Sequence, residues 1–106
     1  ISEIEIFSDT KKFEEQLLFA EGNVIIKTKN AILRSDTFSY DQDLEIMILS
    51  GNIKFKSKNS FLEATNIKYD FINKKGFILN AYGAADFKDI SKLNLSESVK
   101  KKSKYF

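Results

Sequence analysis

The chain has 106 residues, of which 42% are hydrophobic and 13% aromatic, which suits one folded domain with a core rather than a disordered segment. It contains no cysteine and no histidine, so disulfides, thiolate metal sites and the commonest general base are excluded, and we expect no enzyme, no metal and no cofactor. Five lysines and one glutamate after residue 91 produce the net charge of +2. The remaining 12 basic and 14 acidic residues argue against nucleic acid as a partner.

The N-terminal segment has the least regular pattern. Ile4 and Ile6 predict a short first strand. Residues 9–20 carry apolar side chains at helical spacing, but Ser8-Asp9-Thr10 matches Ser35-Asp36-Thr37 further along the chain. This match favours strands over an amphipathic helix for residues 9–20.

From Gly22 onward, apolar residues alternate with charged or polar ones at a period of two, which predicts strands with one inward and one solvent face. The parity shifts by one near Asp36-Thr37 and near Thr65-Asn66, so a bulge or corner is expected at both places. Turns are predicted at residues 29–30, 41–43, 58–59 and 73–76. The predicted inward row consists of Val24, Ile26, Leu33, Phe38, Tyr40, Ile46, Ile48, Ile53, Phe55, Leu62, Ile67, Tyr69, Phe77 and Leu79.

Two stretches of the chain correspond at a constant offset of 29 residues. Gly22-Asn23-Val24 matches Gly51-Asn52-Ile53, and the same offset relates Asp41 to Asp70 without a gap. A constant period of this size predicts stacked copies of one unit, which bury their apolar faces against one another. Gly22 and Gly51 are expected to open their strands, where a side chain would obstruct a bend.

One series of motifs resembles the OstA-like family, the lipopolysaccharide-transport group that includes the periplasmic protein LptA and the N-terminal domain of the translocon LptD. The resemblance covers residues 4–83. Its motifs are Ile6-Phe7-Ser8-Asp9-Thr10, Ala20-Glu21-Gly22-Asn23-Val24, Leu33-Arg34-Ser35-Asp36, Tyr40-Asp41 and Ser50-Gly51-Asn52-Ile53. The chain departs from the pattern at Thr65, which stands where the first copy has Asp36, and at Gly83, which is followed by alanine.

The resemblance implies a twisted, slightly open antiparallel β-jellyroll of stacked rungs over residues 1–91. Residues 92–106 are rich in Lys and Ser and contain few apolar residues, which predicts a flexible tail. It also implies a periplasmic location and an apolar slit, lined by the inward row, that holds the acyl chains of lipopolysaccharide or a similar amphiphilic lipid. Other OstA-like modules, or further copies of this chain, would join at the sheet edges. The predicted edge-pairing residues are Ile4, Ile6, Phe77 and Phe87.

No apolar run is long enough for a transmembrane segment. Because the chain does not begin with Met, we expect a processed form or a fragment whose signal or anchor lies outside this sequence. Both a free-standing bridge protein and the N-terminal domain of a larger translocon remain open.

The residues by themselves leave other interpretations open. The inward row also describes the core of a closed sandwich, which gives the alternative function of a structural or protein-interaction β-module without lipid binding. Asp41 and Asp70 fit turn residues better than an acid–base pair, and Asn23 and Asn52 fit backbone caps better than head-group ligands. A solvated face accounts for the outward lysines as well as contact with lipid phosphates does; these lysines are Lys27, Lys29, Lys54, Lys56 and Lys58.

Overall fold

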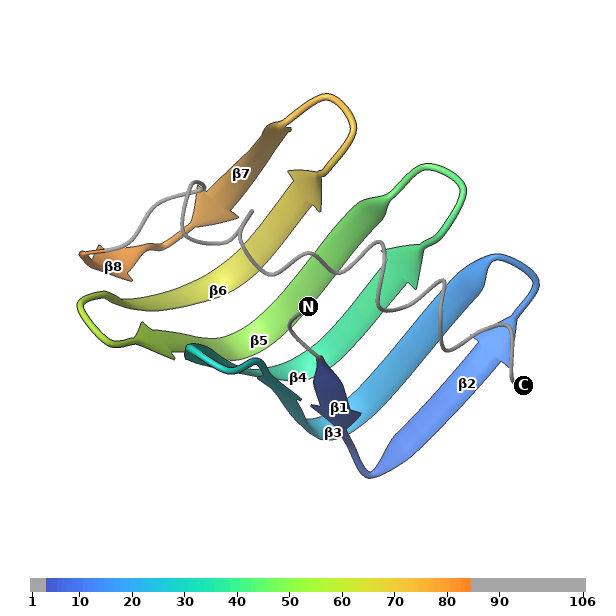
Figure 1. Cartoon of the computed structure of the whole chain (residues 1–106), viewed down its shortest axis with the longest axis horizontal. Helices are drawn as coiled ribbons and strands as arrows, with labels where there is room; N and C mark the ends of the chain where they lie inside the picture. The colour runs from blue at the N-terminus through green and yellow to red at the C-terminus, as the bar shows by residue number, and fades with distance from the viewer. Residues whose placement is uncertain (1–3, 85–106) are drawn as a thin grey trace.

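A computed structural model describes residues 4–84 as one antiparallel sheet of eight strands (Figure 1). The strands are β1 (Glu5–Phe7), β2 (Thr10–Glu14), β3 (Leu17–Lys27), β4 (Ala31–Asp41), β5 (Ile46–Ser57), β6 (Phe61–Asp70), β7 (Lys75–Leu79) and β8 (Tyr82–Gly83). Their order across the sheet is β1-β3-β4-β5-β6-β7, with β2 also paired to β3 and β8 also paired to β6. These residues include no helix long and apolar enough to cross a membrane.

The four long strands, β3 to β6, bend in the middle, and this bend divides the sheet into two halves (Figure 1). The upper half-sheet contains β2, β7 and residues 17–21, 37–41, 46–50 and 66–70 of the long strands. The lower half-sheet contains β1, β8 and residues 24–27, 31–35, 53–57 and 61–64. Each edge of the sheet is therefore made of two short strands, one in each half.

The bend is produced by a Gly-Asn pair in the middle of β3 and another in the middle of β5. Gly22 and Gly51 both have φ of 82°, and Asn23 and Asn52 have φ of 49° and 47°. The pairing register shifts at both places, because two residues oppose one on the neighbouring strand. The expected corner is therefore confirmed. The glycines do not open their strands, however, since the chain continues in ladder pairing on both sides of each bend.

At each bend, the asparagine side chain is hydrogen-bonded to an aspartate that lies earlier in the chain. Asn23 Nδ2 donates to Asp9 Oδ2 at 3.0 Å, and Asn52 Nδ2 donates to Asp36 Oδ2 at 2.9 Å. The third corner uses a different pair, in which Asn80 Nδ2 donates to Thr65 Oγ1 at 2.8 Å. Asn80, which follows β7, also has a left-handed φ of 52°. Thr65 therefore accepts from Asn80 in the way that Asp36 accepts from Asn52.

Residues 9–20 form strands, as the sequence favoured. β2 and the first half of β3 make a hairpin around Glu15-Gln16, and Phe13 lies opposite Leu18. Both of these side chains are partly buried and pack against the core. The apolar spacing that resembles a helix therefore comes from two paired strands, in which Phe13 and Leu18 share the inward face.

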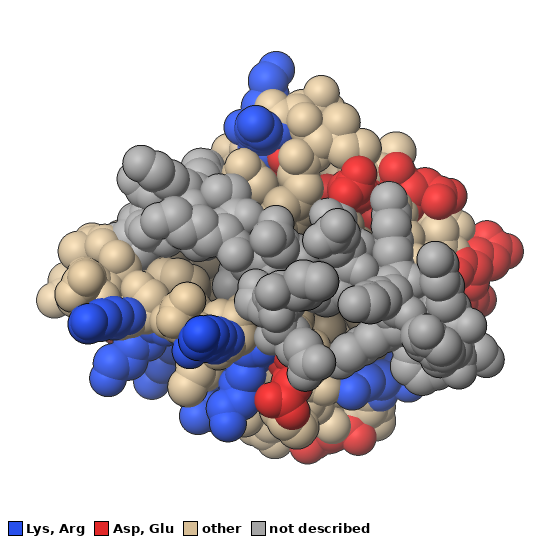
Figure 2. Space-filling view, in the orientation of Figure 1, with Lys and Arg blue, Asp and Glu red and all other residues tan. Residues whose placement is uncertain are grey.

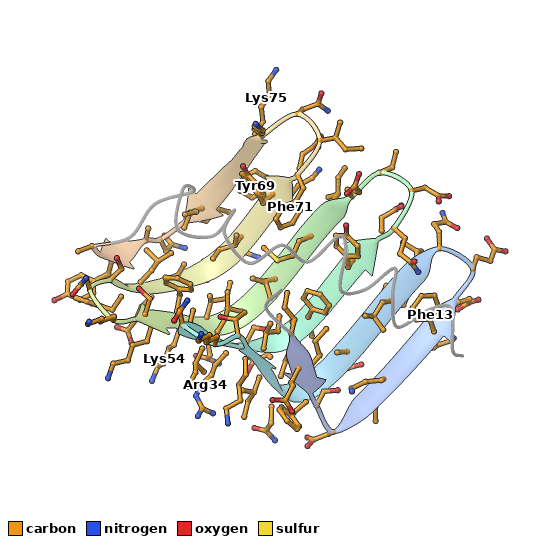
Figure 3. The ribbon with its side chains drawn as sticks, in the orientation of Figure 1. Phe13, Arg34, Lys54, Tyr69, Phe71 and Lys75 are labelled. Atoms are coloured by element: carbon orange, nitrogen blue, oxygen red, sulfur yellow. The ribbon has the colours of Figure 1, made fainter. Side chains whose placement is uncertain are left out.

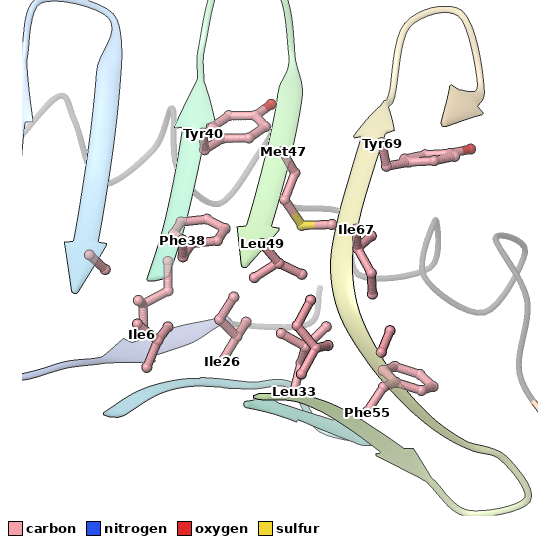
Figure 4. Close-up of a cluster of buried hydrophobic side chains, with 14 of the residues drawn as sticks. Ile6, Ile26, Leu33, Phe38, Tyr40, Met47, Leu49, Phe55, Ile67 and Tyr69 are labelled. Atoms are coloured by element: carbon pink, nitrogen blue, oxygen red, sulfur yellow. The ribbon is translucent and has the colours of Figure 1, made fainter. Parts of the chain in front are cut away.

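The inward side chains form rows that run across the strands and meet between the two half-sheets (Figure 4). Tyr40 and Tyr69 share one row of the upper half-sheet with Met47 between them, and Phe38 and Ile67 share the next row with Leu49 between them. The lower half-sheet contributes a facing row, which consists of Ile6, Ile26, Leu33, Phe55 and Leu62. A single sheet thus supplies both walls of its own core.

We expect Gly51→Ala to destabilise the domain by about 1–3 kcal/mol, because alanine tolerates a left-handed φ poorly. A Cβ at position 51 would also lie within 3.0 Å of the Asp36 Cβ. Thermal or urea unfolding measures this loss.

Lys54→Ala is the control, since Lys54 is exposed on the same strand, and we expect a change within about 0.5 kcal/mol. Equal stability of the Gly51→Ala variant and the original chain would contradict this account of the bend.

Candidate functional site

The candidate site is the apolar interior between the half-sheets. Its centre is formed by residues with at most 7% of their surface exposed. Those that the sequence predicted are Val24, Ile26, Leu33, Phe38, Tyr40, Ile53, Phe55, Leu62, Ile67 and Tyr69. They come from both halves of the sheet, so the alternation correctly identified the inward side of β4 and β6 and of the lower halves of β3 and β5.

The inward residues of the first half of β5 were predicted wrongly. Ile48 is 43% exposed and Ile46 is only partly buried, whereas Met47 and Leu49 are completely buried. Met47 is paired with Tyr40 and Leu49 with Phe38, and directly opposed residues share a face of the sheet. A shift of one residue therefore exchanges the two faces.

The same correction applies to β7. Phe77 and Leu79 are 46% and 48% exposed, so neither lines the interior. Ile78 lies opposite Ile67 and packs against the core instead. The alternating row Phe77, Leu79 and Ala81 indicated the opposite face, because β7 is a short edge strand with apolar residues on both sides.

The predicted edge residues have different positions. Ile6 lies on the edge strand β1 and Ile4 directly precedes it, but both side chains are buried at 7% and 3% exposure, so they belong to the core. Only the backbone of β1 is available to pair with another strand. Phe77 lies on the opposite edge strand, and Phe87 lies outside the described residues.

The interior contains almost no polar chemistry. Ser35 is the one buried polar residue within residues 4–84, and its hydroxyl donates to the Thr37 carbonyl at 3.0 Å. Aromatic rings close the end nearest the 71–74 turn, where Phe71 meets Tyr69 and Tyr40 edge to face at centroid distances of 4.9 and 6.3 Å (Figure 3). Such an interior offers dispersion contacts and burial to hydrocarbon without a buried charge.

Asp41 and Asp70 act in turns. Asp41 Oδ1 accepts the backbone N–H groups of Asp43 and Leu44, both at 2.9 Å. Asp70 accepts from Asn73 and Ile72 in the same way, and the Asn73 backbone N–H is the main cause that lowers the Asp70 pKa below its ordinary value. Each carboxylate therefore organises the turn that follows its own strand.

The outward lysines lie on the outer face of the lower half-sheet or in the turns at its end. Lys27, Lys54 and Lys56 alternate with buried residues along β3 and β5, and Lys29 and Lys58 occupy the turns that follow. All five are exposed. Among residues 4–84, no three His, Cys, Asp or Glu side chains are grouped so that they could hold a metal ion.

No protein-family model matches this chain, and no curated protein matches its sequence.

Ala20, Met47, Leu49 and Ile78 are among the interior residues that the sequence missed. We expect Leu49→Ala to cost about 2–5 kcal/mol of stability, because it leaves a cavity among fully buried neighbours. The adjacent Ile48→Ala is the matched control and should cost less than about 1 kcal/mol, since its side chain faces solvent. Urea unfolding distinguishes the two, and a larger loss for Ile48→Ala would reverse the inward assignment of β5.

Proposed function

We propose that this chain is an OstA-like module of the periplasm that carries lipopolysaccharide, or a similar amphiphilic lipid, with its acyl chains between the two half-sheets. The observation that carries the proposal is the apolar interior enclosed by one bent sheet with an edge on each side. In this proposal the fold is a twisted, slightly open jellyroll of stacked rungs. Its support is the recurrence of the same Gly-Asn corner 29 residues apart, at Gly22-Asn23 and Gly51-Asn52.

In this proposal the bend lowers the free-energy cost of separating the two half-sheets to admit an acyl chain. The ladder hydrogen bonds run within each half-sheet, and the halves are joined covalently only along the corner. Apart from that corner they meet through apolar side chains, and acyl chains offer similar contacts. Each methylene that leaves water contributes about 0.8 kcal/mol, so a few of them offset the cost of ordering an acyl chain.

The proposal also includes edge-to-edge joining of modules. β2 and β7 lie at opposite edges of the upper half-sheet, and continuing the alternation of strand directions from one copy into the next makes them antiparallel. If the cross-strand rows also continue, Lys75 lies opposite Glu14 of the second copy and Gly76 lies opposite its Phe13. This register pairs a cation with a carboxylate and a large inward side chain with the smallest residue.

A structural or protein-interaction module is the second candidate. It is favoured by the close filling of the interior, where ten of the predicted slit residues are already buried against one another. It uses the same edges but takes up no lipid.

Photo-crosslinking from position 55 tests the lipid proposal. We expect a photoreactive residue there to label purified lipopolysaccharide, because Phe55 is buried in the interior, 2% exposed. Positions 54 and 56 are the controls, since their side chains point to solvent on the same strand. If labelling arises only from positions 54 and 56, lipid contacts the outside and the structural-module function is the better one.

Sedimentation over a concentration series tests the joining of modules. We expect self-association that Lys75→Glu weakens, that Glu14→Lys also weakens, and that the double variant restores by exchanging the two charges. Lys54→Glu is the control, because Lys54 is exposed on β5, which is paired with a strand on each side and lies inside the sheet. A chain that stays monomeric at every concentration would contradict edge joining, and lipid labelling at position 55 would be unaffected.

A further inference from the structure

The outer face of the lower half-sheet concentrates positive charge. Its cations are Lys27, Lys29, Arg34, Lys54, Lys56 and Lys58, whereas its carboxylates are Glu5 and Glu63. We call these six cations the basic face. Figure 2 shows Lys and Arg gathered at the lower left, and Figure 3 shows Arg34 and Lys54 pointing outward there, away from the interior.

Acidic residues gather at the other end of the molecule. The β2–β3 and β4–β5 turns of the upper half-sheet carry Glu15, Asp43 and Glu45, whereas the β6–β7 turn carries Lys74. Figure 2 shows red side chains along the upper right, where Figure 1 places the first two turns. The described part of the chain is therefore electrically polarised, although its cations and carboxylates are similar in number. Such a field orients the molecule against a charged partner.

The basic face is not neutralised within residues 4–84. The one ion pair among them joins Lys12 to Glu14 at 3.0 Å on β2, away from this face. Glu5 lies opposite Lys27 and Glu63 lies opposite Lys54, yet neither carboxylate reaches its lysine. The cations thus remain available to an external anion.

Apolar side chains are interleaved with these cations. One row across the strands reads Glu5, Lys27, Ile32, Lys56 and Phe61, in which Ile32 is 37% exposed and Phe61 is 45% exposed. Phe7 is 46% exposed beside this row, and the Lys27 Nζ lies 6.0 Å from its ring centroid. Lysines with exposed aromatic and aliphatic neighbours are the composition that proteins present to a lipid interface.

The shape favours an extended partner over a small anion. Four members of this row, Glu5, Lys27, Ile32 and Lys56, and the 28–30 turn line an open depression of about 490 Å³, which does not enclose a ligand. Five of the six cations are lysines, which act as point charges, and Arg34 is the single guanidinium. The charges are spread over β3, β4, β5 and the turns that follow, so a surface that carries many anions satisfies more of them than one phosphate does.

We propose that the basic face docks this protein on a bilayer surface that carries anionic lipid head groups. Electrostatic attraction brings the lysines to the head groups, and Phe7, Ile32 and Phe61 reach into the interface. This docking uses neither the interior nor the β2 and β7 edges of the upper half-sheet, so a docked molecule keeps both available. It is independent of whether the interior takes up lipid.

Co-sedimentation of the full chain with vesicles tests the proposal. We expect binding to phosphatidylglycerol–phosphatidylcholine vesicles at low salt, little binding to phosphatidylcholine alone, and loss of binding as salt rises. Lys27→Glu with Lys56→Glu should weaken binding at least about tenfold, because it reverses two charges beside the depression. Lys27→Gln with Lys56→Gln should give a smaller loss, and circular dichroism confirms that each variant is folded.

Lys68→Glu with Lys74→Glu is the matched control. It changes the net charge equally at exposed sites of the upper half-sheet, and binding should stay within about twofold. An equal loss in both pairs would overturn the proposal, since net charge alone would then explain binding.

Three further results would also overturn it. The first is no binding to anionic vesicles. The second is displacement of vesicles by millimolar inorganic phosphate at constant ionic strength, which would indicate a discrete anion site. The third is a loss that follows glutamine substitution of Lys100, Lys101, Lys102 and Lys104 and not that of Lys27 and Lys56.

Discussion

The architecture depends on the left-handed backbone at the corners. Residues 4–84 form an eight-stranded sheet with one apolar face and include no helix to cover it, so a flat sheet would leave that face uncovered by any of these residues. The Gly-Asn pairs in β3 and β5 let the backbone turn in mid-strand, and Asp9 and Asp36 hold the asparagines by side-chain hydrogen bonds. The apolar face is thereby folded onto itself. The burial of apolar surface that stabilises the domain thus depends on two bends of two residues each.

This construction separates the chemistry of the inside from that of the outside. Within residues 4–84 the interior holds one buried polar residue, Ser35, so it is suited to hydrocarbon, whether from side chains or from a lipid. The outer face of the lower half-sheet is rich in lysine, and the β2–β3 and β4–β5 turns of the upper half-sheet carry carboxylates. Interior, edges and basic face are therefore three surfaces that separate substitutions can change independently.

Much of the fold was predictable because local rules determine it. The alternation along β4 and β6 has no competing pattern, so its inward residues and its shift of parity near Asp36-Thr37 and Thr65-Asn66 were predicted correctly. Turn residues such as Asp41 and Asp70 were also recognised, since each bonds to backbone groups two and three residues later.

The errors lie where local rules are ambiguous. Ile46-Met47-Ile48-Leu49 is apolar at every position, so either parity fits and only the pairing with β4 decides it. The Asp36–Asn52 and Thr65–Asn80 bonds join residues 16 and 15 positions apart, and no rule of adjacent residues predicts them. Gly22 and Gly51 were assigned to strand starts, where a side chain would obstruct a bend; the bend exists, but it lies in the middle of each strand.

The interrupted edges have a consequence for how this protein avoids unwanted neighbours. A long, flat edge strand would accept almost any extended peptide, and it is the usual starting point of amyloid-like growth. Here each edge is two short strands set at an angle, β1 with β2 and β7 with β8, separated at a corner. A straight peptide can cover only five residues of β2 or β7 before the edge turns away from it. Only a chain whose own edge is interrupted at the same position can pair along the full length of both short strands. The corners that build the core therefore also restrict which partners can pair with the edge.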